Sequence, residues 1–139
     1  MKGTLFTVPK ALPLMRSGGS VARQLRQWVL MHPASSIYSV TKAALRNFAR
    51  SWALDLKGTG IRVNVRSPEP VSTPGLDLAF AGTGQRDAVI NNAMVGQLPS
   101  AGRMGRSEKV AAAVLFLTSD ESSFMTGSEM FVGGGFAQV

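Results

Sequence analysis

The sequence predicts an α/β fold. Apolar residues recur at helical spacing in residues 39–57 and 107–117, and a short apolar stretch with strand character follows each of these segments, at 61–66 and 129–132. Strands that alternate with helices along a chain are typical of layered α/β proteins. A chain of 139 residues is long enough for one modest core, so we expect a single domain over residues 1–139.

The first third of the chain predicts a helix and a turn but no clear strand. Residues 3–15 favour a helix, which Pro9 should kink or begin, because an interior proline costs about 3 kcal/mol. Residues 17–20, Ser-Gly-Gly-Ser, predict a turn. Residues 22–28 alternate arginine and glutamine with apolar residues, unlike the near-continuous Val, Ile and Leu of a buried parallel strand. We therefore expect a helix or an exposed loop there.

The middle of the chain carries the strongest helix prediction. Residues 39–57 place their large apolar side chains on one face, and the helix should end at Lys57-Gly58, a basic last turn followed by glycine. The strand at 61–66 should direct Val63 and Val65 to the same side. The Pro/Gly-rich residues 67–75 predict a loop, and residues 76–104 predict short helices.

The last third predicts one helix and one strand. Ser107-Glu108 should cap a helix that runs to about Leu117, with apolar residues along one face: Val110, Ala113, Val114 and Leu117. Thr126-Gly127 predicts a turn before the strand at 129–132, and three glycines at 133–135 end the ordered core.

Composition narrows the classes of partner. The net charge of +7 attracts anions, but the 15 basic residues are spread along the chain and the aromatic residues are not interleaved with them, which does not favour nucleic acid. No apolar run reaches the roughly 18 residues of a membrane span, and we expect no signal peptide. The absence of cysteine excludes thiolate metal sites and fits a cytoplasmic protein, and His32 alone cannot form a zinc site.

Tyr38 and Lys42 form the most informative pair for chemistry. Four residues apart at the start of the strongest helix, they share one helical face, one turn apart. A nearby ammonium favours phenolate over phenol, so Tyr38 is a candidate for exchanging a proton with a substrate. The same spacing occurs on many helices as an ordinary surface pair, so the pair needs its sequence context.

That context resembles the C-terminal half of the short-chain dehydrogenase/reductase family. The Tyr-x-x-x-Lys helix is followed by Ile61-Arg62-Val63-Asn64, by Ser67-Pro68 and Pro70, and by Thr73-Pro74-Gly75, in the order that the family shows. The resemblance runs from about residue 2 to 136, with a break near 22–31. It implies a partial Rossmann-like, doubly wound parallel sheet whose N-terminal cofactor-binding half is missing.

The resemblance also implies a site and its ligands. Tyr38 would be the acid/base, and Lys42 would support it and bind the nicotinamide ribose of NAD or NADP. Pro68, Val71 and Thr73 would complete the cofactor-binding set. The substrate would be a small carbonyl or alcohol, and the partner either a second copy of the chain or an intact relative.

Several residues depart from the family pattern. Leu25 or Arg26 stands where the spacing places a catalytic serine, and no Gly-x-x-x-Gly-x-Gly loop for the pyrophosphate occurs in the chain. Glu69 replaces a glycine of the nicotinamide loop, Arg66 replaces a small apolar residue, and Gly133 stands where an aspartate is common. The family's catalytic asparagine is also missing, because Met1 stands at the position just before Lys2.

Two interpretations of the chain follow. In the first, it is an NAD(P)-dependent oxidoreductase of this family that is inactive as an isolated chain. In the second, it is a truncated pseudoenzyme that acts only by association. The break at 22–31 is either a frameshifted stretch, which we favour because the pattern resumes in register at Pro33, or a divergent segment with its own role.

Overall fold

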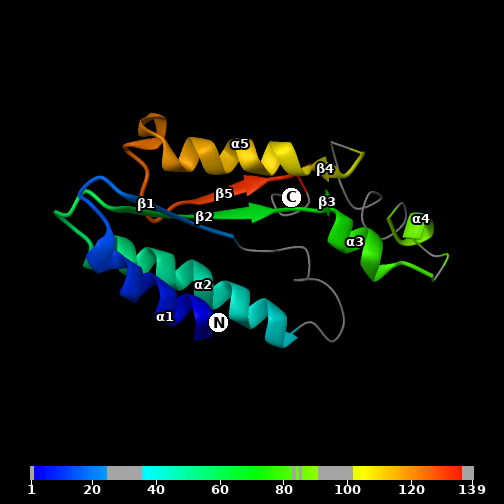
Figure 1. Ribbon diagram of the computed structural model, residues 1–139, viewed down its shortest axis with the longest axis horizontal. Coiled ribbons are helices and arrows are strands. Elements are labelled where there is room, and N and C mark those ends of the chain that lie inside the picture. Colours follow the sequence, from blue (N-terminus) through cyan, green and yellow to red (C-terminus); the bar gives the residue numbers. More distant parts are fainter. Residues whose placement is uncertain (1, 25–35, 83, 85, 91–101, 136–139) are drawn as a thin grey trace.

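The computed structural model of the protein describes residues 2–24, 36–82, 84, 86–90 and 102–135. At its centre is a parallel sheet of three strands in the order β1 (Ser20–Gln24), β2 (Arg62–Pro68) and β5 (Glu129–Val132). Helices α1 (Lys2–Ala11) and α2 (Ser36–Asp55) cover one face, and α5 (Ser107–Thr118) covers the other (Figure 1). The predicted α/β architecture is confirmed.

The hydrophobic core lies between the sheet and the helices α1 and α2. Val63 and Val65 of β2 are 0% and 1% exposed, as a strand whose alternate side chains face one layer requires. They pack against side chains from both helices: Val8 of α1, and Leu45, Ala49 and Trp52 of α2. The predicted common orientation of Val63 and Val65 is therefore confirmed.

The opposite face of β2 carries polar side chains, and Arg62 fastens the end of α5 there. Its Nη1 donates to the carbonyl oxygen of Leu117 (3.1 Å) and to both oxygens of Ser122 (2.9 and 2.7 Å). Its Nη2 donates to the carbonyl oxygen of Ser119 (3.0 Å). Leu117 lies in the last turn of α5, where carbonyl oxygens have no partner within the helix, and the buried guanidinium donates to its carbonyl oxygen.

The expectation of a helix or loop from residue 22 is wrong for residues 22–24. They belong to β1, and the remainder of that segment lies outside the described residues. Among the described strands β1 pairs only with β2, and its side chains stay partly exposed. Arg23 Nη2 donates to Thr4 Oγ1 of α1, and Gln24 accepts a hydrogen bond from Arg66. The apolar pattern of a fully buried strand is therefore not needed here.

Two helix boundaries also differ from expectation. The helix expected over residues 3–15 ends at Ala11 and is followed by a 3₁₀ turn (Leu12–Leu14). Of the two alternatives for Pro9, that it marks the start of the helix is wrong, because Pro9 lies inside α1. The residue before α5 is Arg106, and Ser107 is already helical. Its hydroxyl donates to the carbonyl oxygen of Ser72 (3.3 Å), so it links α5 to a neighbouring segment and does not cap the helix.

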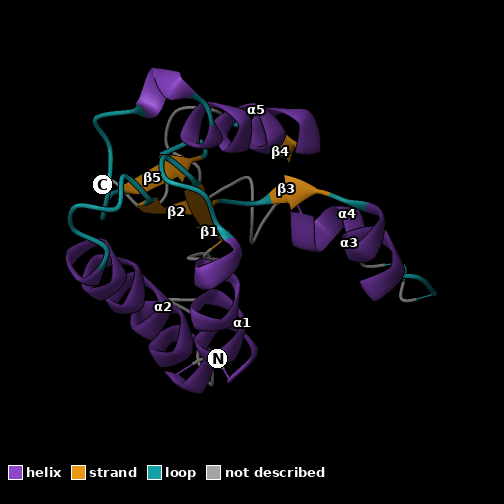
Figure 2. Cartoon of the chain, turned by 60° about the vertical axis from the view of Figure 1, so that its left-hand side comes forward, coloured by secondary structure: helices purple, strands orange, loops and turns teal. Residues whose placement is uncertain are grey.

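The segment after β2 is more ordered than a loop. β3 (Val71–Ser72) pairs in parallel with β4 (Gly105–Arg106), and α3 (Pro74–Ala79) begins after Thr73, whose Oγ1 accepts a hydrogen bond from the Leu76 amide (3.2 Å). α4 (Arg86–Val89) lies beside α3 beyond β3 (Figure 2). The expected short helices are confirmed there, while residues 91–101 of that region lie outside the described part.

None of the described helices combines the length and the apolar character needed to cross a bilayer.

Candidate functional site

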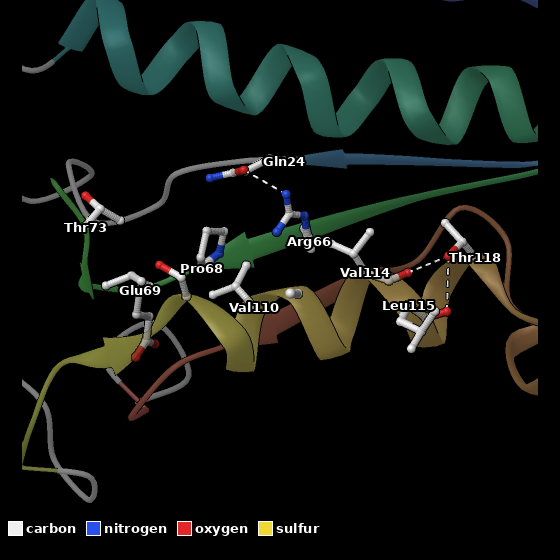
Figure 3. A pocket seen from close by; sticks show the side chains of 12 residues that line it. Gln24, Arg66, Pro68, Glu69, Thr73, Val110, Val114, Leu115 and Thr118 are labelled. Atoms are coloured by element: carbon white, nitrogen blue, oxygen red, sulfur yellow. Dashed lines mark hydrogen bonds between the residues drawn. The ribbon is translucent and has the colours of Figure 1, made fainter. Parts of the chain in front are cut away.

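A cleft of about 710 Å³ lies between the end of β2 and helix α5. This volume falls in the range of about 300–1,000 Å³ typical of ligand sites. β2 contributes Arg66 and Pro68 to its wall, and α5 contributes Val110 and Val114 (Figure 3). Because open parallel α/β sheets bind ligands outside the carboxyl ends of their strands, this is the edge where a site is expected.

Three of the predicted cofactor-binding residues lie together in this cleft. Pro68, Val71 and Thr73 all line it, and they come from the end of β2, from β3 and from the residue that precedes α3. Lys42 is not among the lining residues. The structure thus brings part of the predicted set to one wall, and its role in binding a cofactor stays a prediction.

Tyr38 and Lys42 both belong to the first two turns of α2. Lys42 is partly buried, and the side chain of Tyr38 lies outside what the structure describes. α2 begins at the edge of the sheet at which β2 and β5 end (Figure 1). The backbone therefore brings the predicted catalytic pair to the edge of the sheet that also carries the cleft.

An ion pair fixes this face of α2 to the sheet. Arg46 follows Lys42 by four residues and so shares its face. Its Nε lies 2.7 Å from Oε2 of Glu129 on β5, although the N–H does not point along this contact as in an aligned hydrogen bond. The other carboxylate oxygen, Oε1, accepts a hydrogen bond from Ser67 Oγ of β2 (2.5 Å). With its side chain only 10% exposed, Glu129 holds α2, β2 and β5 in one arrangement.

Glu69 and Gly133, two of the departures from the family pattern, touch one another. Glu69 is 4% exposed, and its Oε2 accepts a hydrogen bond from the Gly135 amide (3.1 Å). A Cβ on residue 133 would overlap the Glu69 carboxylate and its Cγ. A side chain at residue 133 would therefore have to displace the buried Glu69 side chain, and glycine avoids this overlap.

Arg66 is the cationic residue of the cleft. Its Nη2 donates to Gln24 Oε1 (2.9 Å), and among the described residues Gln24 is the only hydrogen-bond partner of this guanidinium. Its Nε is buried and unpaired. Burial lowers the pKa of Arg66 below its ordinary value, because removing the guanidinium from water disfavours its charged form.

The described residues contain no cluster of three or more His, Cys, Asp or Glu side chains that would hold a metal ion. Leu25 and Arg26, at the spacing expected of a catalytic serine, lie outside the described residues. The chemistry of the described site thus rests on the start of α2, the end of β2 and the facing side of α5.

A family described as enoyl-(acyl carrier protein) reductase matches residues 1–137 of the chain. This match covers nearly all of the sequence and includes both the Tyr-x-x-x-Lys helix and the loop after β2. The chain belongs to the short-chain dehydrogenase/reductase family.

Individual relatives agree with this assignment. An oxidoreductase of Sarocladium schorii, asL5, is 41% identical over 142 residues, which cover 100% of this chain and 54% of that protein. The 3-oxoacyl-(acyl-carrier-protein) reductase FabG of Thermotoga maritima is 30% identical, with 97% and 53% covered. The aldohexose dehydrogenase of Thermoplasma acidophilum superposes with a TM-score of 0.82 at 27% identity, over 97% of this chain and 55% of that one. The chain spans about half the length of the curated relatives that it matches.

Some residues of the cleft were not predicted from the sequence of this short-chain dehydrogenase/reductase chain. Gln24 and Ser107 line the cleft, yet Gln24 lay in a segment not expected to be a strand, and Ser107 was expected only as a helix cap. The predicted apolar face of α5 was a usable signal, because Val110 and Val114 of that face form the opposite wall.

Proposed function

We propose that the protein is an NAD(P)-dependent short-chain oxidoreductase that interconverts a carbonyl compound and an alcohol, and that this chain is inactive by itself. The observation that carries this proposal is the cleft at the carboxyl end of β2, where Pro68, Val71 and Thr73 meet, at the edge of the sheet where α2 begins. A protein of the same fold, ElxO, was solved with NADP bound, at a TM-score of 0.84 and 24% identity.

In this proposal, Tyr38 donates a proton to the substrate oxygen during reduction and accepts it during oxidation. Lys42, one turn away, favours the phenolate form of Tyr38 and donates hydrogen bonds to the ribose of the cofactor. The cofactor, when bound, supplies or accepts the hydride. The Arg46–Glu129 contact keeps this face of α2 at a fixed distance from the sheet, which orients both residues.

The residues present fit only part of such a cofactor. Pro68 and Val71 line the cleft. The Glu69 carboxylate does not close the cleft at these residues, because it is turned away from Arg66 (Figure 3) and accepts a hydrogen bond from the Gly135 amide. The chain contains no glycine-rich loop to hold the pyrophosphate. It also offers no serine at the expected spacing, and removal of one preorganised donor costs about 10²–10³ in rate. These gaps are the basis for proposing inactivity.

The first test is a titration of the chain with NADH and NADPH, followed by nicotinamide fluorescence and melting temperature. A ligand that binds only the folded protein stabilises it by RT ln(1 + [L]/Kd), so binding must shift the melting temperature. We expect no saturable signal at about 1 mM cofactor. A Kd of about 1 mM corresponds to a binding free energy of only about 4 kcal/mol in magnitude, so even weak binding would be detected at this concentration. Saturable binding with turnover would overturn the proposed inactivity.

The oxidoreductase role is tested by joining the chain to the N-terminal half of the Sarocladium relative. We expect this chimera to bind NADPH, and Lys42→Met to weaken binding by about tenfold or more, because a charged hydrogen bond is lost. Tyr38→Phe should retain binding but lower carbonyl reduction by about 10²-fold or more. Lys57→Met, at an exposed residue in the turn that follows α2, is the matched control. Equal effects of Lys42→Met and Lys57→Met would contradict the assigned roles.

A second candidate function is non-catalytic association with another copy of the chain or with an intact relative. It is favoured by β1, which among the described strands has a partner on one side only and therefore offers an open parallel edge. The cytoplasm is our proposed location for either function, on the basis of the absence of cysteine. Cofactor binding and turnover by the chimera support the first function, whereas a stable oligomer of the chain together with a chimera that binds no cofactor supports the second.

A further inference from the structure

Two arginines on the same face of β2 are used very differently. Arg62 and Arg66 are four residues apart, so both project toward α5. Arg62 makes hydrogen bonds to backbone and side-chain oxygens at the end of α5. Arg66 has Gln24 as its only hydrogen-bond partner among the described residues, and its Nε is buried without any partner. The fold thus has a structural use for the first arginine and leaves most donors of the second unused.

An unpaired and partly buried cation is costly, because its charge loses water without gaining a counter-charge. The acidic residue of the same cleft does not offset this cost. The Glu69 carboxylate is bonded to the Gly135 amide and turned away from Arg66 (Figure 3). No ion pair is found for Arg66 among the described residues, so a bound anion would supply the counter-charge that this guanidinium lacks there.

The other residues that line the cleft indicate the chemistry of the remainder of a ligand. Val110, Val114 and Leu115 of α5 line the side that faces Arg66, and Leu115 is 70% exposed although it is apolar. The amide of Gln24, whose oxygen is used by Arg66, leaves its two N–H donors for a ligand. The cleft therefore combines a cationic fork with an apolar surface in a volume of about 710 Å³.

We propose that this cleft binds an amphipathic anion, with an anionic oxygen group on Arg66 and its apolar part against Val110, Val114 and Leu115. A planar guanidinium matches carboxylate and phosphate alike, since it offers two parallel N–H donors to either group. This binding requires neither the catalytic pair nor a cofactor, and its test uses no cofactor. Because Pro68, Val71 and Thr73 line the same cleft, such a ligand would occupy part of the space that the proposed function gives to the cofactor.

The experiment compares three probes that share one apolar tail: octanoate, octyl phosphate and octanol. Calorimetric titration of the chain at constant ionic strength should show binding of at least one anionic probe. The neutral octanol should bind about tenfold or more weakly, because it makes no charge-assisted hydrogen bond. The tighter of the two anions identifies the preferred group. Arg66→Met should abolish the preference for the anion over octanol, and Arg66→Lys should retain part of it.

Arg50→Met, an exposed arginine of α2, is the matched control and should leave all three affinities unchanged. A second readout separates a binding role from a structural one. Without ligand, Arg66→Met should melt at a higher temperature than the parent chain, because a desolvated and unpaired charge has been removed; a structural role would lower the melting temperature. Equal affinity for octanoate, octyl phosphate and octanol, no binding of any probe, or unchanged anion binding in Arg66→Met would overturn the proposal.

Discussion

At the residue scale, Glu69 and Gly133 explain one another. Each is unusual for the short-chain dehydrogenase/reductase pattern when it is considered alone. In the structure, the Glu69 carboxylate fills the space beside residue 133 and accepts a hydrogen bond from the Gly135 amide. A buried carboxylate from the loop after β2 thus accepts a hydrogen bond from the glycine-rich turn after β5.

We predict that Gly133→Ala destabilises the chain by about 1–3 kcal/mol, the usual cost of overpacking, because the new methyl overlaps the Glu69 side chain. Glu69→Ala should cost about 1–3 kcal/mol as well, since the Gly135 amide loses its acceptor. In the Glu69→Ala background, Gly133→Ala should cost less than about 0.5 kcal/mol, since the clash has gone. Urea unfolding of the four proteins gives the coupling free energy.

Gly3→Ala is the matched control for this cycle. Gly3 lies in α1 with open space around it, so alanine there should be neutral or stabilise the helix. Additive costs of Gly133→Ala and Glu69→Ala would show that the two residues do not share the space that the structure gives them.

A second comparison at this scale concerns the pH dependence of stability through Arg66. Because its pKa is lowered in the folded chain, the unfolded chain binds the proton more tightly. The resulting penalty is constant through neutral pH and declines only as the pH rises toward the ordinary pKa of arginine. The higher melting temperature expected for Arg66→Met should therefore be the same throughout the neutral range.

At the scale of elements, the position of α2 depends on contacts that its own sequence does not contain. Its apolar face predicts that it packs on a sheet, but its axial position is fixed by Arg46 and Glu129. Ser67 completes the contact from β2. A helix that carries both candidate catalytic residues is thus fixed by residues from two strands that lie later in the chain.

We predict that Glu129→Gln lowers the free energy of unfolding by about 1–3 kcal/mol, because Arg46 loses its counter-charge in a mostly buried site. Glu121→Gln, on an exposed turn after α5, should change it by less than about 0.5 kcal/mol. Chemical denaturation with urea measures both. A loss as small for Glu129→Gln as for Glu121→Gln would mean that the ion pair does not hold α2 in place.

At the scale of the whole molecule, the described sheet has an open edge at β1, and several large apolar side chains outside the sheet are exposed. Leu54 and Phe124 are 77% and 103% exposed, and β1 lacks a second neighbour among the described strands. Exposed apolar surface together with an open strand edge favours association between chains. This is the physical basis of the second candidate function.

We predict that the chain self-associates with increasing concentration, and that the double variant Leu54→Ser/Phe124→Ser does so less, because its exposed apolar surface is smaller. Sedimentation velocity over a range of concentrations measures the shift. Asp55→Ser, an exposed polar neighbour of Leu54, should behave like the parent chain. Equal sedimentation at all concentrations would show that these surfaces do not mediate association.

The sequence by itself determined the alternation of helices and strands and the core face of β2. It also determined the family, because periodic apolar residues and short motifs are local properties of the chain. The positions of α2, β2, α5 and β5 followed from these patterns to within a few residues. Where β1 would form did not follow, because its arginine and glutamine are tolerated only where Thr4 and Arg66 bond to them.

Only the tertiary structure decided which departures from the family pattern belong together. The contact between Glu69 and Gly133 joins residues far apart in the sequence, and the cleft joins the end of β2 to α5. Arg62 makes four hydrogen bonds near the end of α5, whereas Arg66 bonds only Gln24 among the described residues, and this difference likewise depends on how α5 packs on the sheet. These contacts depend on how the helices and strands pack against one another, and no local pattern in the sequence predicts that packing.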